Sequence, residues 1–110
     1  MRDVDHILVR DSILMRFVFT SEVSWKSIKA YLEEKFALEI SVPSDVYRAA
    51  LKVGMLTAED TQRCLEMIRD RNRLAHDYSE KFAEGLYARI KNGYAPLLRS
   101  IINHVPEMPV

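Results

Sequence analysis

Hydrophobic side chains recur at helical spacing over the first third of the chain. No Gly or Pro interrupts residues 3 to 36, where the apolar positions are mostly separated by three, four or seven residues. These positions are Leu14, Phe17, Trp25, Ile28, Leu32 and Phe36, with the small Ser21 between them. Their period predicts one face of a long amphipathic helix. Its opposite, solvated face carries Arg16, Glu22, Lys26, Lys29 and Glu33. The pattern leaves open whether residues 7–9 continue this helix or form a separate turn.

Helix start and stop signals divide the next part of the chain. Pro43 disfavours helical geometry at Val42, so residues 38–43 are predicted to form a connector. Ser44 or Asp45 can then cap a short helix that runs through Val53 and stops at Gly54. Residues 57–60, with the sequence Thr-Ala-Glu-Asp, resemble a capping box that starts a third helix. This helix is predicted to run to about Ala75 and to bury Cys64, Leu65 and Ile68.

The last helix is predicted to begin near a cap at Asp77 or Ser79. Its apolar stripe consists of Phe82, Leu86, Ile90, Leu97 and Ile101. The pair Asn92-Gly93 and the following Pro96 should loosen or kink this helix near its middle. Four principal helices with short connections predict an all-α fold, an antiparallel four-helix up-and-down bundle with an additional short helix. We expect a single domain over residues 1–105 and a flexible tail over residues 106–110.

Composition narrows the classes of function. The 110 residues hold 16 basic and 16 acidic side chains, so a nucleic acid could be attracted only by a local patch. Cys64 is the single cysteine, which excludes an internal disulfide and fits a reducing compartment. No apolar run approaches the roughly 18 residues that span a bilayer. These features predict a cytoplasmic protein with no membrane contact, and no cofactor or metal site is indicated. His6 and His104 lie near the termini and are predicted to face solvent.

The segment from Asp70 to Tyr78 carries the chemistry that the sequence suggests. On a continuous helix Asn72 and His76 share a face, whereas Arg71 points about 140° away from His76. Arg71 and His76 converge only if the Arg side chain folds back, the helix ends between them, or a second chain completes the site. A neutral imidazole can exchange a proton with a ribose 2′-hydroxyl, and a guanidinium can stabilise charge on a phosphate. Such a set suits metal-independent RNA cleavage.

The neighbours of this motif have narrower predicted roles. Asn72 could orient His76 or contact a phosphate. Arg69 and Arg73 add local positive charge that could attract an RNA backbone. An Arg and a His five residues apart are also common on any charged helix, so the spacing alone does not distinguish a catalytic pair from surface residues.

A family resemblance makes the motif more specific. Residues 71–78 follow the pattern Arg-Asn-x3-His-x-Tyr, which resembles the signature of HEPN proteins of the nucleotidyltransferase substrate-binding type. The same family's long first helix, short second helix and last helix resemble residues 10–34, 43–54 and 87–98. The resemblance covers about residues 9 to 103. It implies a HEPN four-helix bundle that forms a homodimer and is encoded beside a minimal nucleotidyltransferase.

The resemblance also implies roles for individual residues. In many such pairs the HEPN chain is a metal-independent endoribonuclease toxin, silenced when the nucleotidyltransferase transfers AMP to the motif tyrosine. Carried over to this sequence, His76 and Arg71 are the catalytic pair, Asn72 supports them, and Tyr78 is the AMP acceptor. The segment that precedes Arg10 is shorter than in many relatives, which bears on how the dimer interface is completed.

Three functions remain open from the sequence. The first is an enzyme, a ribonuclease toxin that cuts RNA and is controlled by its cognate nucleotidyltransferase. The second is a non-catalytic subunit that binds a nucleotide or substrate for the nucleotidyltransferase, and the neutral net charge favours it mildly. The third, a purely structural helical adaptor, is less favoured because the motif is intact.

Overall fold

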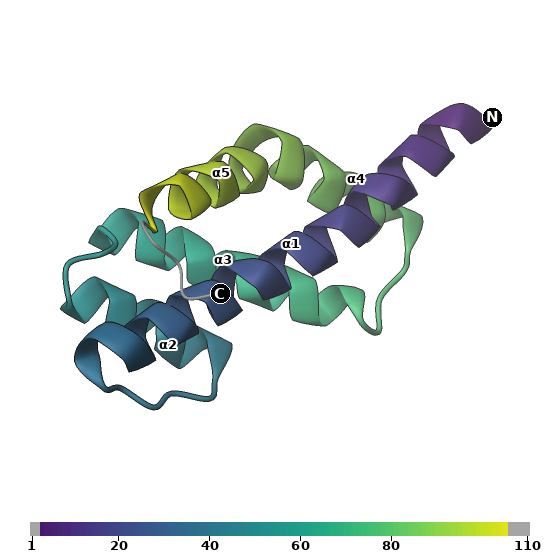
Figure 1. The fold of residues 1–110 in the computed structure, drawn as a ribbon. Helices are drawn as coiled ribbons and strands as arrows, with labels where there is room; N and C mark the ends of the chain where they lie inside the picture. The colour runs from purple at the N-terminus through teal and green to yellow at the C-terminus, as the bar shows by residue number, and fades with distance from the viewer. Residues whose placement is uncertain (1–2, 106–110) are drawn as a thin grey trace.

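The computed structural model describes residues 3–105. Helices account for most of this region, and no strand occurs within it (Figure 1). The elements in chain order are α1 (Val4–Phe36), α2 (Pro43–Lys52), α3 (Ala58–Leu74), α4 (Glu80–Arg89), the π-helical turn η1 (Ile90–Tyr94) and α5 (Ala95–His104). The all-α bundle predicted from the sequence is therefore confirmed.

Helix α1 extends over 33 residues and includes residues 7–9, which continue the helix and form no separate turn. The Asp3 carboxylate caps its start by accepting a hydrogen bond from the Asp5 amide. Leu14, Ile28 and Leu32 are buried as the apolar period predicts, and Trp25 is half-buried against the same core. Phe36 was expected on this stripe but is 46% exposed. It is the last residue of the helix, and the C-cap Ala37 that follows has a left-handed conformation.

Helix α2 begins earlier than the sequence suggested. Pro43 is its first residue and Val42 its N-cap, so the expected cap at Ser44 or Asp45 is wrong. Proline suits a first helical position because its ring already holds φ near the helical value and the amide it lacks would have no partner there. The helix ends at Lys52, and Gly54 turns the chain with a φ of +85°.

Helix α3 starts as predicted, with the Thr57 hydroxyl accepting a hydrogen bond from the Asp60 amide at 3.0 Å. Its buried face is shifted by a fraction of a turn from the predicted one. Cys64 is fully buried, but Leu65 and Ile68 are only half-buried, and Met67 takes the core position expected for them. Spacings of three and four residues allow neighbouring helical faces, and the contacts with α1 and α2 select between them.

The last helical run changes geometry where the sequence predicted a weakness. After the Ser79 cap, which accepts a hydrogen bond from the Phe82 amide, α4 leads into the π-helical turn η1. A regular α-helix would press the ring of Pro96 against the carbonyl of Asn92, and the wider turn before Pro96 avoids this clash. The Arg63 guanidinium donates to the Gly93 carbonyl at 2.9 Å and covers the widened turn.

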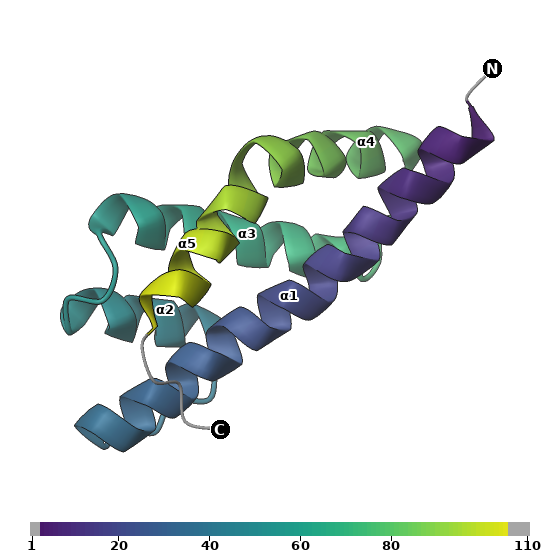
Figure 2. The ribbon, with the colours of Figure 1, turned by 45° about the horizontal axis from the view of Figure 1, so that its top comes forward.

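The helices pack around α1, which runs along the molecule and contacts each of the other α-helices (Figure 2). Helices α2 and α3 lie against one another, and α4 packs on the N-terminal half of α1. Within the core, the Ser24 and Tyr47 hydroxyls share a buried hydrogen bond of 2.8 Å. Burial raises the pKa of the Cys64 thiol to about 12, so this side chain serves as a small apolar core residue.

Two sequence predictions concern features beyond the packed helices. The predicted tail, residues 106–110, lies outside the described residues, and the division into a domain and a tail stays a prediction. Over residues 3–105, no helix combines the length and apolar character that crossing a lipid bilayer requires.

Candidate functional site

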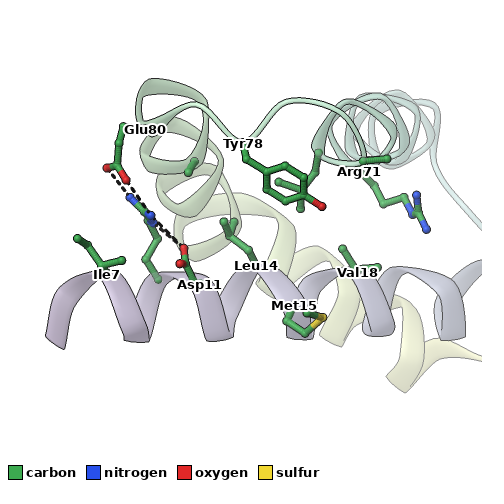
Figure 3. A pocket seen from close by; sticks show the side chains of 12 residues that line it. Ile7, Asp11, Leu14, Met15, Val18, Arg71, Tyr78 and Glu80 are labelled. Carbon is green, nitrogen blue, oxygen red and sulfur yellow. Dashed lines mark hydrogen bonds and ion pairs between the residues drawn. The ribbon is translucent and has the colours of Figure 1, made fainter. Parts of the chain in front are cut away.

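A groove of about 650 Å³ lies between the N-terminal half of α1 and the segment that joins α3 to α4 (Figure 3). Its floor is largely aliphatic, because Leu14 and Val18 of α1 face Leu74 of α3 and Ala83 of α4. Charged groups stand toward the sides, with Asp11 and Glu80 in one group and Arg71 in the other. Arg10 belongs to the first group, because its guanidinium donates to both of these carboxylates. Volume and lining both fall in the range typical of small-ligand sites.

Arg71 leaves the last turn of α3 and contacts α1. Its guanidinium pairs with the Glu22 carboxylate at 3.3 Å, and both side chains are about one-third exposed. The Trp25 indole N–H donates to the other oxygen of Glu22 at 2.6 Å. Glu22 therefore fixes Arg71, although the sequence placed Glu22 on a solvated face. Because both members of the pair reach solvent, an anionic ligand could replace Glu22 as the partner of Arg71.

His76 lies beyond the end of α3, which stops at Leu74 between the two predicted catalytic residues. Its backbone amide donates to the Arg73 carbonyl at 3.1 Å, and its side chain is exposed. The groove is lined by Arg71 but not by His76 or Asn72. Within residues 3–105, no hydrogen bond joins the His76 ring to Arg71 or to any other side chain. A single copy of the chain thus presents His76 and Asn72 outward and keeps Arg71 beside the groove.

Tyr78 occupies the short connection between α3 and α4 and is 76% exposed. Figure 3 shows its ring reaching from this connection toward Leu14 and Val18 of α1, with its hydroxyl end on the side of Arg71. The connection is held in place because the Asp77 carboxylate accepts a hydrogen bond from the Ser79 amide at 3.0 Å. The phenol is therefore both accessible and positioned over the groove.

The two additional predicted phosphate-binding residues differ in their surroundings. Arg69 is exposed on α3. Arg73 is also exposed, but its guanidinium donates to Asp77 at 2.9 Å and lies 4.3 Å from the centre of the Phe82 ring. Arg73 therefore helps to fix the connection that carries Tyr78, which leaves Arg69 as the more available cation.

A charged cluster at the far side of the groove was not anticipated from the sequence. Arg10 is 4% exposed, and its guanidinium donates to Glu80 at 2.8 Å, to Glu84 at 3.1 Å and to Asp11 at 3.0 Å. The hydrogen bond to Glu80 is the largest of the contacts that raise the pKa of Arg10 above its usual range, so this charge is permanent. The sequence does contain a sign of this cluster. Arg10 stands four residues before Leu14 and so occupies a position on the apolar stripe, where a charged residue is unusual.

His6 joins the same cluster and corrects a second expectation. Its Nε2 atom lies 3.0 Å from a carboxylate oxygen of Glu84, and its ring meets the edge of Tyr87 with 5.6 Å between ring centres. The sequence predicts that His6 faces solvent, because Glu84 is too distant along the chain for residue spacing to indicate this contact. Through His6 and Arg10, the first two turns of α1 are tied to Glu80 and Glu84 in the first half of α4.

Known proteins agree with this architecture. The chain is similar to the crystal structure of ttk003001694 from Thermus thermophilus, with 36% sequence identity and a TM-score of 0.83. That match covers 89% of this chain and 82% of the other. Among curated proteins, none matches the sequence. The family described as "Nucleotidyltransferase substrate binding protein like" matches residues 2–107. Because the match spans nearly the whole chain, this protein belongs to the nucleotidyltransferase substrate binding protein like family.

Proposed function

We propose that this chain is the non-catalytic binding subunit of a separately encoded minimal nucleotidyltransferase and presents Tyr78 to that enzyme as an acceptor of AMP. Family membership supports the pairing. The observation that carries the acceptor role is the 76% exposure of Tyr78 on a fixed connection above an apolar groove. An acceptor must enter another enzyme's active site, and a tyrosine on a short, well-anchored connection meets that requirement.

The transfer needs only ATP as co-substrate. The Tyr78 hydroxyl oxygen attacks the α-phosphorus of ATP, the bond from that phosphorus to the bridging oxygen breaks, and pyrophosphate leaves. The phenolic proton passes to a basic group of the nucleotidyltransferase. The product is a phosphodiester between Tyr78 and adenosine, and the chain itself contributes the nucleophile and the docking surface.

Intact mass measurement after coexpression with the neighbouring nucleotidyltransferase tests this proposal. We expect added mass equal to AMP, mapped to Tyr78 by peptide sequencing and absent from a Tyr78→Phe variant. Tyr87→Phe is the matched control, because Tyr87 is also a partly accessible tyrosine at the neighbouring helix. Unmodified protein in every sample, despite a stable complex, would refute the acceptor role and leave only a docking function.

A metal-independent endoribonuclease is the second candidate function. It is favoured by the exposure of both His76 and Asn72 near the same end of α3 as Arg69, where an RNA phosphate would be accessible. Because Arg71 pairs with Glu22 within one copy, this activity requires a homodimer. The second copy would either supply its own Arg71 guanidinium or release Arg71 of the first copy from Glu22. AMP on Tyr78, two residues from His76, would then block the RNA.

Expression of the chain alone separates the two candidates. A ribonuclease predicts growth arrest and RNA loss with the wild-type chain and neither with His76→Ala. His104→Ala is the matched control, because His104 is an exposed histidine at the end of α5 and does not belong to the motif. If none of the three proteins arrests growth or causes RNA loss, the ribonuclease is excluded and the binding subunit remains.

A further inference from the structure

The groove beneath Tyr78 has properties that the acceptor role alone does not require. An acceptor needs only an accessible hydroxyl, yet this tyrosine is itself part of the lining of a cavity of about 650 Å³. Any group attached to its hydroxyl oxygen therefore starts at the groove, and its position is limited by a short covalent tether.

We infer that the groove is a seat for the transferred mononucleotide, so that AMP on Tyr78 folds back onto its own chain and places its base against the floor between α1 and α3. This inference rests on the proposed function and specifies the state that follows the transfer. Its basis is the placement of Tyr78, Arg71 and the aliphatic floor around one cavity.

The floor matches the faces of a nucleobase. Leu14, Val18 and Leu74 present aliphatic side chains to the cavity, and a base is a flat ring whose faces are poorly hydrated. Covering this floor would remove apolar surface from water on both partners. The cavity is large enough for a base and ribose without displacement of the helices.

Arg71 provides a partner for the phosphate. Its guanidinium borders the groove and is held by a single partly exposed carboxylate, that of Glu22, at 3.3 Å. The phosphodiester on Tyr78 carries one negative charge, so it can take the place of Glu22 in a charge-assisted hydrogen bond. Glu22 then keeps its hydrogen bond from the Trp25 indole and is not left without a partner.

Because AMP is tethered to Tyr78, even a weak affinity of the base for the groove is enough to keep it bound there. A short flexible linker gives an effective concentration on the order of millimolar, so a base with only millimolar affinity for the floor would occupy it for a large part of the time. The seated nucleotide would also be shielded from enzymes that hydrolyse phosphodiesters. The modification would therefore be longer-lived than AMP on an isolated exposed tyrosine.

Nuclear magnetic resonance on the modified full-length chain tests this inference directly. After AMP on Tyr78 has been verified by mass, we expect nuclear Overhauser contacts between the adenine protons and the methyl groups of Leu14, Val18 and Leu74. Adenine signals identical to those of free AMP, with no methyl contact, would overturn the seat while leaving the acceptor role intact. Absence of AMP from Tyr78 would refute both proposals.

A groove-filling variant gives an independent measurement. Ala75 is exposed and borders the groove, so Ala75→Phe is expected to fold and to occupy the seat with its ring. Added phosphodiesterase should release AMP several-fold faster from this variant than from the wild type. Ala58→Phe, at an exposed position in the first turn of α3, is the control and should release AMP at the wild-type rate. Equal rates in all three proteins would contradict the seat.

Discussion

Two arginines border the same groove in opposite circumstances. Arg10 is almost fully buried and donates to three carboxylates, those of Asp11, Glu80 and Glu84. Arg71 is about one-third exposed and pairs with one carboxylate, that of Glu22. The first guanidinium has its hydrogen-bonding capacity largely used by the protein, and the second retains donors that a ligand can reach.

The two arginines therefore have different expected roles at the same groove. The Arg10 cluster ties α1 to α4 and holds Glu80, two residues after Tyr78, so it defines the position of the connection that carries the acceptor. The Arg71 pair can open without exposing a buried charge. A ligand-binding role is therefore expected for the Arg71 end of the groove, and a stabilising role for the Arg10 end.

Replacement of the buried arginine should have the largest effect. Arg10→Met keeps most of the side-chain volume but leaves three carboxylates without their shared cation, and we expect a loss of about 2 kcal/mol of unfolding free energy. The estimate is moderate because Asp11 and Glu80 are more than half exposed and can be hydrated. Thermal denaturation should show a Tm lower by about 10 °C. Arg16→Met, at an exposed position on the same helix, should leave Tm nearly unchanged.

A core hydrogen bond away from the groove provides an intermediate case. Tyr47→Phe removes the partner of the buried Ser24 hydroxyl, which lies 2.8 Å from the Tyr47 oxygen. We expect a loss of about 1 kcal/mol, because the Ser24 hydroxyl can still turn toward a backbone carbonyl of its own helix. Urea denaturation measures the loss, with Tyr31→Phe as the control. A loss as large as that of Arg10→Met would contradict the special importance of the charged cluster.

Removal of the second groove arginine should barely affect stability. Arg71→Gln breaks one partly exposed ion pair, which is worth less than about 0.5 kcal/mol. The same variant should lose the slow release of AMP that the seat predicts, because the phosphate would lack its cation. Urea denaturation and the phosphodiesterase assay together measure both effects. A stability loss comparable to that of Arg10→Met would show that Arg71 is structural.

The smallest expected effect is a pH dependence at the connection itself. The amide and hydroxyl of Ser79, followed by the Arg73 guanidinium, hold the pKa of Asp77 below its usual value. Since the folded-state pKa is lowered, the ionised Asp77 contributes stability above the unfolded-state pKa of about 3.9, and this contribution is lost as the pH falls through the folded-state value. The difference in Tm between the wild type and Asp77→Asn should therefore be present at pH 6 and vanish in strong acid. A difference that grew on acidification would contradict this assignment.

The helix boundaries could be read from the sequence because they depend on local chemistry. Thr57 caps α3 through its own hydroxyl, and Gly93 and Pro96 mark the widened turn within a few residues of where it occurs. The predicted position of the α2 cap is wrong because the two polar residues after Pro43 resemble capping residues. Proline at the first helical position made such a cap unnecessary.

The groove and its charges could not be read in the same way. Arg10 on the apolar stripe is a visible anomaly, but two of its three carboxylate partners, Glu80 and Glu84, lie about 70 residues away, and sequence spacing does not show which distant helices meet. Glu22 likewise looks like a surface residue until Arg71 and Trp25 are seen to converge on it. The motif was visible as a pattern, whereas the outward placement of His76 depended on the point at which α3 ends.

Hydrogen–deuterium exchange on the complex with the neighbouring nucleotidyltransferase tests the central claim most directly. If that enzyme engages the connection that carries Tyr78, amides of residues 75–80 should exchange more slowly in the complex than in the free chain. The connection at the other end of α3, residues 53–57, should exchange at an unchanged rate. Protection of residues 53–57, with residues 75–80 unaffected, would contradict the account.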